Sequence, residues 1–84
     1  MTRSQSHPQL LLAPYCIGAK LRSLRMERRL TLAQLAAETG LSTPLLSKLE
    51  TDRMVPTLAT LATICRSYGV GLGHFFRDPA EPSL

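Results

Sequence analysis

Residues 31–51 of this chain, TLAQLAAETGLSTPLLSKLET, decide its fold. Thr31 followed three residues later by Gln34 is a capping box, which marks the start of a helix. Gly40 can take the left-handed conformation that ends a helix, and Ser42 is a second N-cap. The stretch therefore predicts two short helices, the second over residues 43–51, joined by a tight turn.

Two helices joined by a short turn that contains glycine form a helix-turn-helix. Ala36 supplies the small side chain that the crossing of the two helices requires. Four leucines supply the apolar side chains that both helices turn toward a core: Leu35, Leu41, Leu46 and Leu49. The same arrangement also occurs in helical bundles that never contact DNA, because it is first a way of packing helices. These residues alone leave DNA binding and a plain bundle both open.

Helical patterns continue on both sides of this stretch. Toward the N-terminus, apolar residues recur at helical spacing and predict a first helix over residues 17–29: Ile17, Leu21 and Leu24. Toward the C-terminus, Thr57 caps a fourth helix that Gly69 ends. Apolar side chains over residues 70–76 suggest a short fifth helix. We therefore predict an all-α bundle of about five helices with a central helix-turn-helix.

The chain of 84 residues has room for one domain. Residues 1–13 are polar and then briefly apolar, and we interpret them as a flexible N-terminal arm. Residues 14–76 form the predicted domain. Residues 77–84 are polar and rich in proline, which is typical of a tail or linker.

Composition favours a polyanionic partner and argues against an enzyme. Ten Lys and Arg residues against six Asp and Glu give a net charge of +4. The sequence shows no nucleophile elbow, phosphate loop or metal-ligand spacing, so we expect no catalysis, no metal and no cofactor. The apolar run at residues 10–13 is far too short to span a bilayer. We expect a cytoplasmic protein that does not enter the membrane.

At residues 17–76 the chain resembles the Cro and lambda-repressor type of helix-turn-helix family, also called the xenobiotic-response-element (Xre) family. The resemblance is carried by LRSLRMERRLTLAQLAAETGLSTPLLSKLE at residues 21–50, by Pro56-Thr57, and by YGVGLGHFF at residues 68–76. The ending HFFRDPAEPSL also resembles a linker that leads to a cupin barrel in longer relatives. The chain is therefore either a short regulator or the DNA-binding part of a longer one.

The resemblance implies a transcription regulator, usually a homodimer, that lays helix 43–51 in the major groove of double-stranded DNA. It implies that four residues face base edges: Thr43, Pro44, Ser47 and Lys48. It implies phosphate contacts from Thr31, the helix start at Leu32, Thr51 and Arg53. It also implies an ion pair between Arg25 and Glu50 that joins the first helix to the third.

Three positions depart from the family pattern. Leu32 stands where many members have a glutamine that reaches a phosphate, so only its backbone N–H remains for that contact. Asp52 replaces the usual glycine after the reading helix, and aspartate tolerates the left-handed region at modest cost. Pro44 makes the reading face apolar and suited to thymine methyl groups, so Lys48 has to supply most of the polar readout.

The dimer interface is expected near the C-terminal end of the bundle, at Leu72, Phe75 and Phe76. We predict that Cys65 is a buried thiol. For Cys16, near a helix start, an inert thiol and a redox sensor both stay open. The alternative function is a protein-interaction module, antitoxin-like or an adaptor. Salt distinguishes the two functions, because only phosphate-driven binding weakens steeply with ionic strength.

Overall fold

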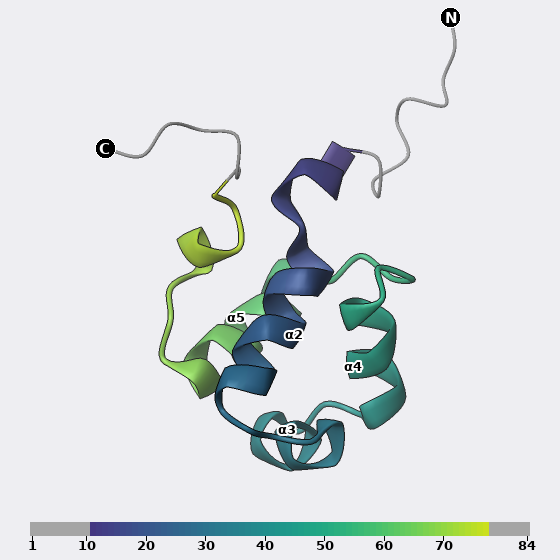
Figure 1. Cartoon of the computed structure of the whole chain (residues 1–84), viewed down its shortest axis with the longest axis vertical. Helices are drawn as coiled ribbons and strands as arrows, with labels where there is room; N and C mark the ends of the chain where they lie inside the picture. The colour runs from purple at the N-terminus through teal and green to yellow at the C-terminus, as the bar shows by residue number, and fades with distance from the viewer. Residues whose placement is uncertain (1–10, 78–84) are drawn as a thin grey trace, which may run out of the picture.

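The computed structural model describes residues 11–77, which form helices joined by turns and loops. In chain order the elements are η2 (Ala13–Tyr15), α2 (Ile17–Glu27), α3 (Leu32–Thr39), α4 (Thr43–Glu50), α5 (Leu58–Tyr68) and η3 (Leu72–His74). Figure 1 shows α2 across the middle of the molecule, with α4 on one side and η3 on the other. The predicted all-α class is confirmed.

The caps that the sequence predicted begin and end the helices. Thr31 Oγ1 accepts from the Gln34 N–H at 3.0 Å, and Gln34 Oε1 accepts from the Thr31 N–H at 2.8 Å. Ser42 Oγ accepts from the backbone N–H at the third position of α4, at 3.2 Å. Gly40 ends α3 with φ 77° and Gly69 ends α5 with φ 72°. Local sequence alone therefore fixes where α3 begins and where α3 and α5 end.

The short fifth helix predicted within residues 70–76 is present as a single 3-10 turn, η3, at residues 72–74. Gly69, Gly71 and Gly73 alternate through this segment, and glycine is the poorest helix former after proline. Within the predicted N-terminal arm, residues 11–12 are helical, and Leu12 packs against the core. The rest of the predicted arm, residues 1–10, and residues 78–84 of the tail lie outside the described residues.

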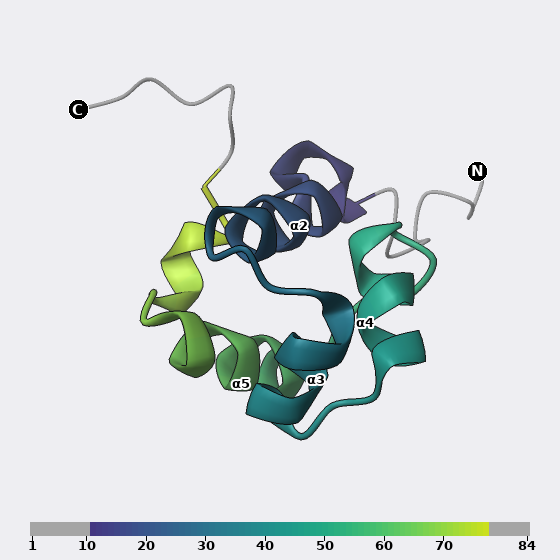
Figure 2. The ribbon, with the colours of Figure 1, turned by 60° about the horizontal axis from the view of Figure 1, so that its bottom comes forward.

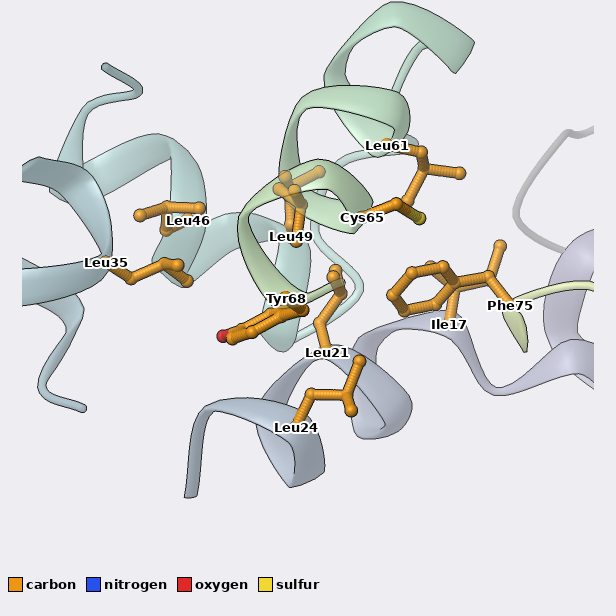
Figure 3. Packing of buried hydrophobic residues seen from close by; sticks show 11 residues of the cluster. Ile17, Leu21, Leu24, Leu35, Leu46, Leu49, Leu61, Cys65, Tyr68 and Phe75 are labelled. Carbon is orange, nitrogen blue, oxygen red and sulfur yellow. The ribbon is translucent and has the colours of Figure 1, made fainter. Parts of the chain in front are cut away.

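Side chains from α2, α3, α4 and α5 and from the segment after η3 form one core (Figure 3). Its members are Ile17, Leu21, Leu24, Leu35, Leu46, Leu49, Leu61, Ile64, Cys65, Tyr68 and Phe75. Cys65 is buried, as predicted, and burial raises the pKa of its thiol. Among residues 11–77 the buried Tyr68 hydroxyl has no hydrogen-bond partner, and desolvation raises its pKa to about 12.

Gly18 sets how closely α2 approaches the end of α4. A Cβ atom at this position would lie 2.8 Å from the carbonyl oxygens of both Leu49 and Glu50. Only a glycine therefore lets the N-terminal turn of α2 rest on the last carbonyl groups of α4. Opposite ends of two helix dipoles meet at this contact, which is favourable. Figure 2 shows the N-terminal part of α2 beside α4.

Candidate nucleic-acid interface

Helix α4 has one face in the core and the other in solvent. Leu46 and Leu49 are 2% and 1% exposed, and Leu45 packs against the core. The four residues predicted to read bases all lie on the opposite side: Thr43, Pro44 and Lys48 are exposed, and Ser47 is half-buried. Positions four apart on a helix share a face. The structure therefore brings these four side chains together on one outward surface, the α4 outer face.

The N-terminal end of α3 presents the first two predicted phosphate ligands. Thr31 is exposed, and its hydroxyl oxygen accepts one hydrogen bond while the hydroxyl still has a proton to donate. Leu32 is half-buried and packs against the core, so its side chain has a structural role. Its backbone N–H belongs to the first turn of α3, where N–H groups have no intrahelical acceptor. This end of α3 thus offers N–H and O–H donors to an anion.

The two later phosphate candidates differ in how well their geometry suits that role. The Thr51 hydroxyl donates to the Ser47 carbonyl oxygen at 2.8 Å, so its one proton already closes the end of α4. A phosphate contact through this hydroxyl would require that bond to break. Arg53 is exposed, and its backbone N–H donates to the Lys48 carbonyl oxygen at 2.8 Å. The structure therefore suits Arg53 to a phosphate better than Thr51.

Arg25 and Glu50 form a two-pronged ion pair between α2 and the last residue of α4. Arg25 Nε lies 2.7 Å from Glu50 Oε2, and Arg25 Nη2 lies 2.9 Å from Glu50 Oε1. A third donor, Arg25 Nη1, bonds the Leu30 carbonyl oxygen at 2.9 Å, in the loop before α3. The hydrogen bond to Glu50 raises the pKa of Arg25. One guanidinium thus holds α2, α4 and the entry to α3 in fixed relation.

Asp52 does more than replace a glycine in the turn after α4. It takes the left-handed conformation, with φ 58°, as that turn requires. Its Oδ1 atom lies at the start of α2, 2.6 Å from where a Cβ on Gly18 would be. A carboxylate near a helix N-terminus is stabilising. The side chain therefore ties the loop after α4 to α2.

Two cations, Lys20 in α2 and Arg28 directly after it, have structural roles that no pattern in the sequence predicted. Lys20 Nζ donates to the Arg77 carbonyl oxygen at 2.6 Å and to the Phe75 carbonyl oxygen at 3.3 Å. Arg28 Nη2 donates to the Tyr68 carbonyl oxygen at 2.6 Å, and its guanidinium lies 5.3 Å from the Tyr68 ring centroid. Both side chains hold the C-terminal part of the bundle against α2. No spacing in the sequence pairs residues so far apart.

The predicted dimer interface needs a correction at Phe75. Its side chain is 0% exposed, because the ring fills the core of its own bundle. Phe76 is half-buried and packs edge-on against Tyr15, with ring centroids 5.9 Å apart. Leu72 is 37% exposed. The apolar surface expected here is therefore mostly used inside the protomer, and only Leu72 remains clearly open.

Comparison with known proteins identifies the family of this domain. Residues 17–74 match a family model described as a helix-turn-helix domain. This chain belongs to that helix-turn-helix family. The domain is 32% identical over 65 residues to the HTH-type transcriptional regulator PuuR of Escherichia coli K12, and 37% identical over 54 residues to the immunity repressor protein of Bacillus phage phi105. By name the first is a transcriptional regulator and the second a repressor, in line with the prediction that the chain is not an enzyme.

Solved structures agree with this assignment. A helix-turn-helix transcriptional regulator from Vibrio cholerae superposes with a TM-score of 0.71 at 32% identity, covering 77% of this chain and 37% of that one. The clp gene regulator ClgR from C. glutamicum superposes with a TM-score of 0.67 at 32% identity, covering 75% and 82%.

The domain spans only part of its curated relatives. The aligned segments cover 77% of this chain but 35% of PuuR, and 64% of this chain but 38% of the phage repressor. No helix within residues 11–77 is long and apolar enough to cross a membrane. Across the same residues, no three His, Cys, Asp or Glu side chains come together as a metal site would need.

Proposed function

We propose that the helix-turn-helix domain is a sequence-specific DNA-binding module of a cytoplasmic transcription regulator. Helix α4 enters the major groove, and the module works as a homodimer on an operator with two half-sites. One observation carries the proposal: the α4 outer face presents Thr43, Ser47 and Lys48 to solvent, while the Arg25–Glu50 pair and the core hold the other face. A reading helix needs such a fixed, outward face that carries hydrogen-bonding side chains.

The groups have separate roles in this mechanism. Lys48 donates to acceptors on a guanine edge, and Thr43 or Ser47 adds a further hydrogen bond. Pro44, exposed in the first turn of α4, contacts a thymine methyl group. The N-terminus of α3, with the Thr31 hydroxyl, binds a phosphate and sets the register of α4 in the groove. Arg53 binds a second phosphate.

Selection of bound sequences from a random DNA library tests this function directly. We expect enrichment of a site with two related halves, and affinity that falls log-linearly with salt. An apolar protein-interaction module would enrich no site and would show little dependence on salt. That result would replace DNA binding with the adaptor or antitoxin-like function.

The variant Lys48→Ala tests the readout by α4. On the selected site we expect a loss of about 1–3 kcal/mol in binding free energy and a relaxed preference at one base pair. Arg53→Ala is the matched control, because a phosphate contact weakens binding to all sequences alike. If Lys48→Ala also weakens all sequences equally, Lys48 is a phosphate ligand and its assignment to base reading is wrong.

A further inference from the structure

The N-terminal tip of α4, residues 43–45, is poor in backbone hydrogen-bond donors. Pro44 has no backbone N–H, and the Leu45 N–H donates to Ser42 Oγ at 3.2 Å. In the described part of the chain, Thr43 is the one tip residue that keeps a backbone N–H without an acceptor. The start of α3 differs, because neither of its first two residues is a proline and both carry such N–H groups. The tip of α4 is therefore a weaker site for a phosphate than the start of α3.

The tip of α4 offers apolar surface in place of donors. Pro44 is exposed, and its ring carries CH₂ groups and no polar atom. Leu45 packs against the core and leaves Pro44 as the apolar group that faces out. In the major groove the apolar group that a base pair presents is the C5 methyl group of thymine. The exposed ring therefore suits a methyl group on the floor of the groove.

The Thr43 hydroxyl, next to this ring and also exposed, suits more than one base. A hydroxyl both donates and accepts hydrogen bonds. Thymine presents the O4 acceptor beside its C5 position, whereas cytosine presents the N4 amino donor there. Thr43 can therefore bond either pyrimidine. The methyl group then becomes the distinguishing feature, because thymine and 5-methylcytosine carry it and unmodified cytosine does not.

We propose that Pro44 reads the C5 methyl group of a pyrimidine, with the Thr43 hydroxyl bonded to the same base, so that the domain accepts 5-methylcytosine in place of an operator thymine. This inference rests on the proposed function, because it names what one part of the α4 outer face recognises. Methylation of cytosine at that position of a DNA site then strengthens binding.

Lys48 has a separate role on the same face. Its ammonium group carries donors and no acceptor, so it recognises an acceptor such as a guanine edge. A methyl group on a neighbouring pyrimidine changes neither the O6 nor the N7 atom of that guanine. The response to methylation therefore depends on Pro44 and is independent of Lys48.

The expected effect of one methyl group is modest and measurable. Burial of one CH₂ group contributes about 0.8 kcal/mol. Because a factor of ten in affinity corresponds to about 1.4 kcal/mol, burial of one methyl group changes Kd by about fourfold.

Duplexes with single base changes test the inference on the 84-residue chain. Each thymine of the selected site is replaced in turn by deoxyuridine, which removes the methyl group and keeps every hydrogen-bonding group. At the sensitive position, cytosine and 5-methylcytosine, each paired with guanine, then replace thymine. A duplex with deoxyuridine only in the flanking sequence is the control. Fluorescence anisotropy measures Kd for each duplex.

We expect the wild type to bind the deoxyuridine duplex about fourfold more weakly than the thymine duplex. We expect it to bind the 5-methylcytosine duplex about fourfold more tightly than the cytosine duplex. Pro44→Ser removes the apolar ring, so both ratios fall below about twofold. Lys48→Ala is the matched control, because it weakens binding to every duplex and keeps both ratios. Circular dichroism checks folding, and Pro44→Gly replaces Pro44→Ser if that variant does not fold.

Three results would overturn the inference and leave sequence-specific DNA binding standing. In the first, a folded Pro44 variant keeps the fourfold ratios, so another group reads the methyl. In the second, the wild type tolerates deoxyuridine at every thymine of the site. In the third, it binds 5-methylcytosine no better than cytosine. If the wild type selects no DNA site at all, the proposed function itself fails.

Discussion

Removing Glu50 should destabilise the bundle strongly, because it leaves a partly buried guanidinium without its anion. In the ion pair, the side chains of Arg25 and Glu50 are 12% and 7% exposed, so water cannot readily replace the lost carboxylate. Breaking a buried pair by deleting one partner costs about 3–5 kcal/mol. Arg25 keeps its hydrogen bond to the Leu30 carbonyl oxygen, which favours the lower end. For Glu50→Ala we therefore expect a loss of about 3 kcal/mol.

That loss is a large part of the total free energy of unfolding of the chain. At about 0.05–0.15 kcal/mol per residue, a chain of this length has a free energy of unfolding of about 4–13 kcal/mol. A loss of about 3 kcal/mol lowers Tm by roughly 12–24 °C in a domain of this size. Thermal and urea unfolding, followed by circular dichroism, measure both quantities.

Two further variants test whether the charge left without a partner causes the loss of stability. Replacing both partners by apolar residues, Arg25→Met with Glu50→Leu, should recover much of the stability, because no charge is left buried without a partner. Glu50→Gln keeps the shape of the side chain, and its free energy of unfolding should lie between those of Glu50→Ala and the apolar double variant. A Glu50→Ala protein with an unchanged melting curve would refute the reasoning, since the pair would then contribute nothing to holding α4 against α2.

Two other predictions concern packing and alkaline pH. Gly18→Ala should lower the free energy of unfolding by about 1–3 kcal/mol, because its Cβ would lie 2.8 Å from two carbonyl oxygens of α4. The control Gly71→Ala meets no atom within 4 Å and should be nearly neutral. Equal melting of the two variants would contradict the close approach of α2 to α4. Tyr68→Phe should retain or gain stability, by up to about 1 kcal/mol, because it removes a buried hydroxyl that has no partner. The pKa of Tyr68 rises from 10.0 to about 12 in the folded state, so the phenol ionises first in the unfolded chain. The wild type therefore loses stability from pH 10 to pH 12, by up to about 1.4 kcal/mol per pH unit. Urea unfolding at several pH values should show that loss reduced in Tyr68→Phe, and an identical pH dependence in both proteins would sink the idea.

Local sequence determined the boundaries of the helices and the outward face of α4. Capping by Thr31, Ser42 and Thr57 involves residues three apart, and a glycine that ends a helix needs only its own backbone freedom. Such interactions are short in sequence, so a pattern can predict them. The four positions on the α4 outer face follow in the same way, because helical periodicity alone separates them from Leu46 and Leu49.

Only the tertiary structure decided the interactions between distant residues. No pattern in the sequence gives Lys20 or Arg28 a partner, yet both bond carbonyl groups at the C-terminal end of the bundle. The segment that ends in Phe75 is too rich in glycine for a helix, so the ring reaches the core of its own bundle rather than a partner. Gly18 is an ordinary helix residue until α4 packs against it. Each outcome depends on which groups the folded chain brings within a few ångströms, and no local periodicity encodes that distance.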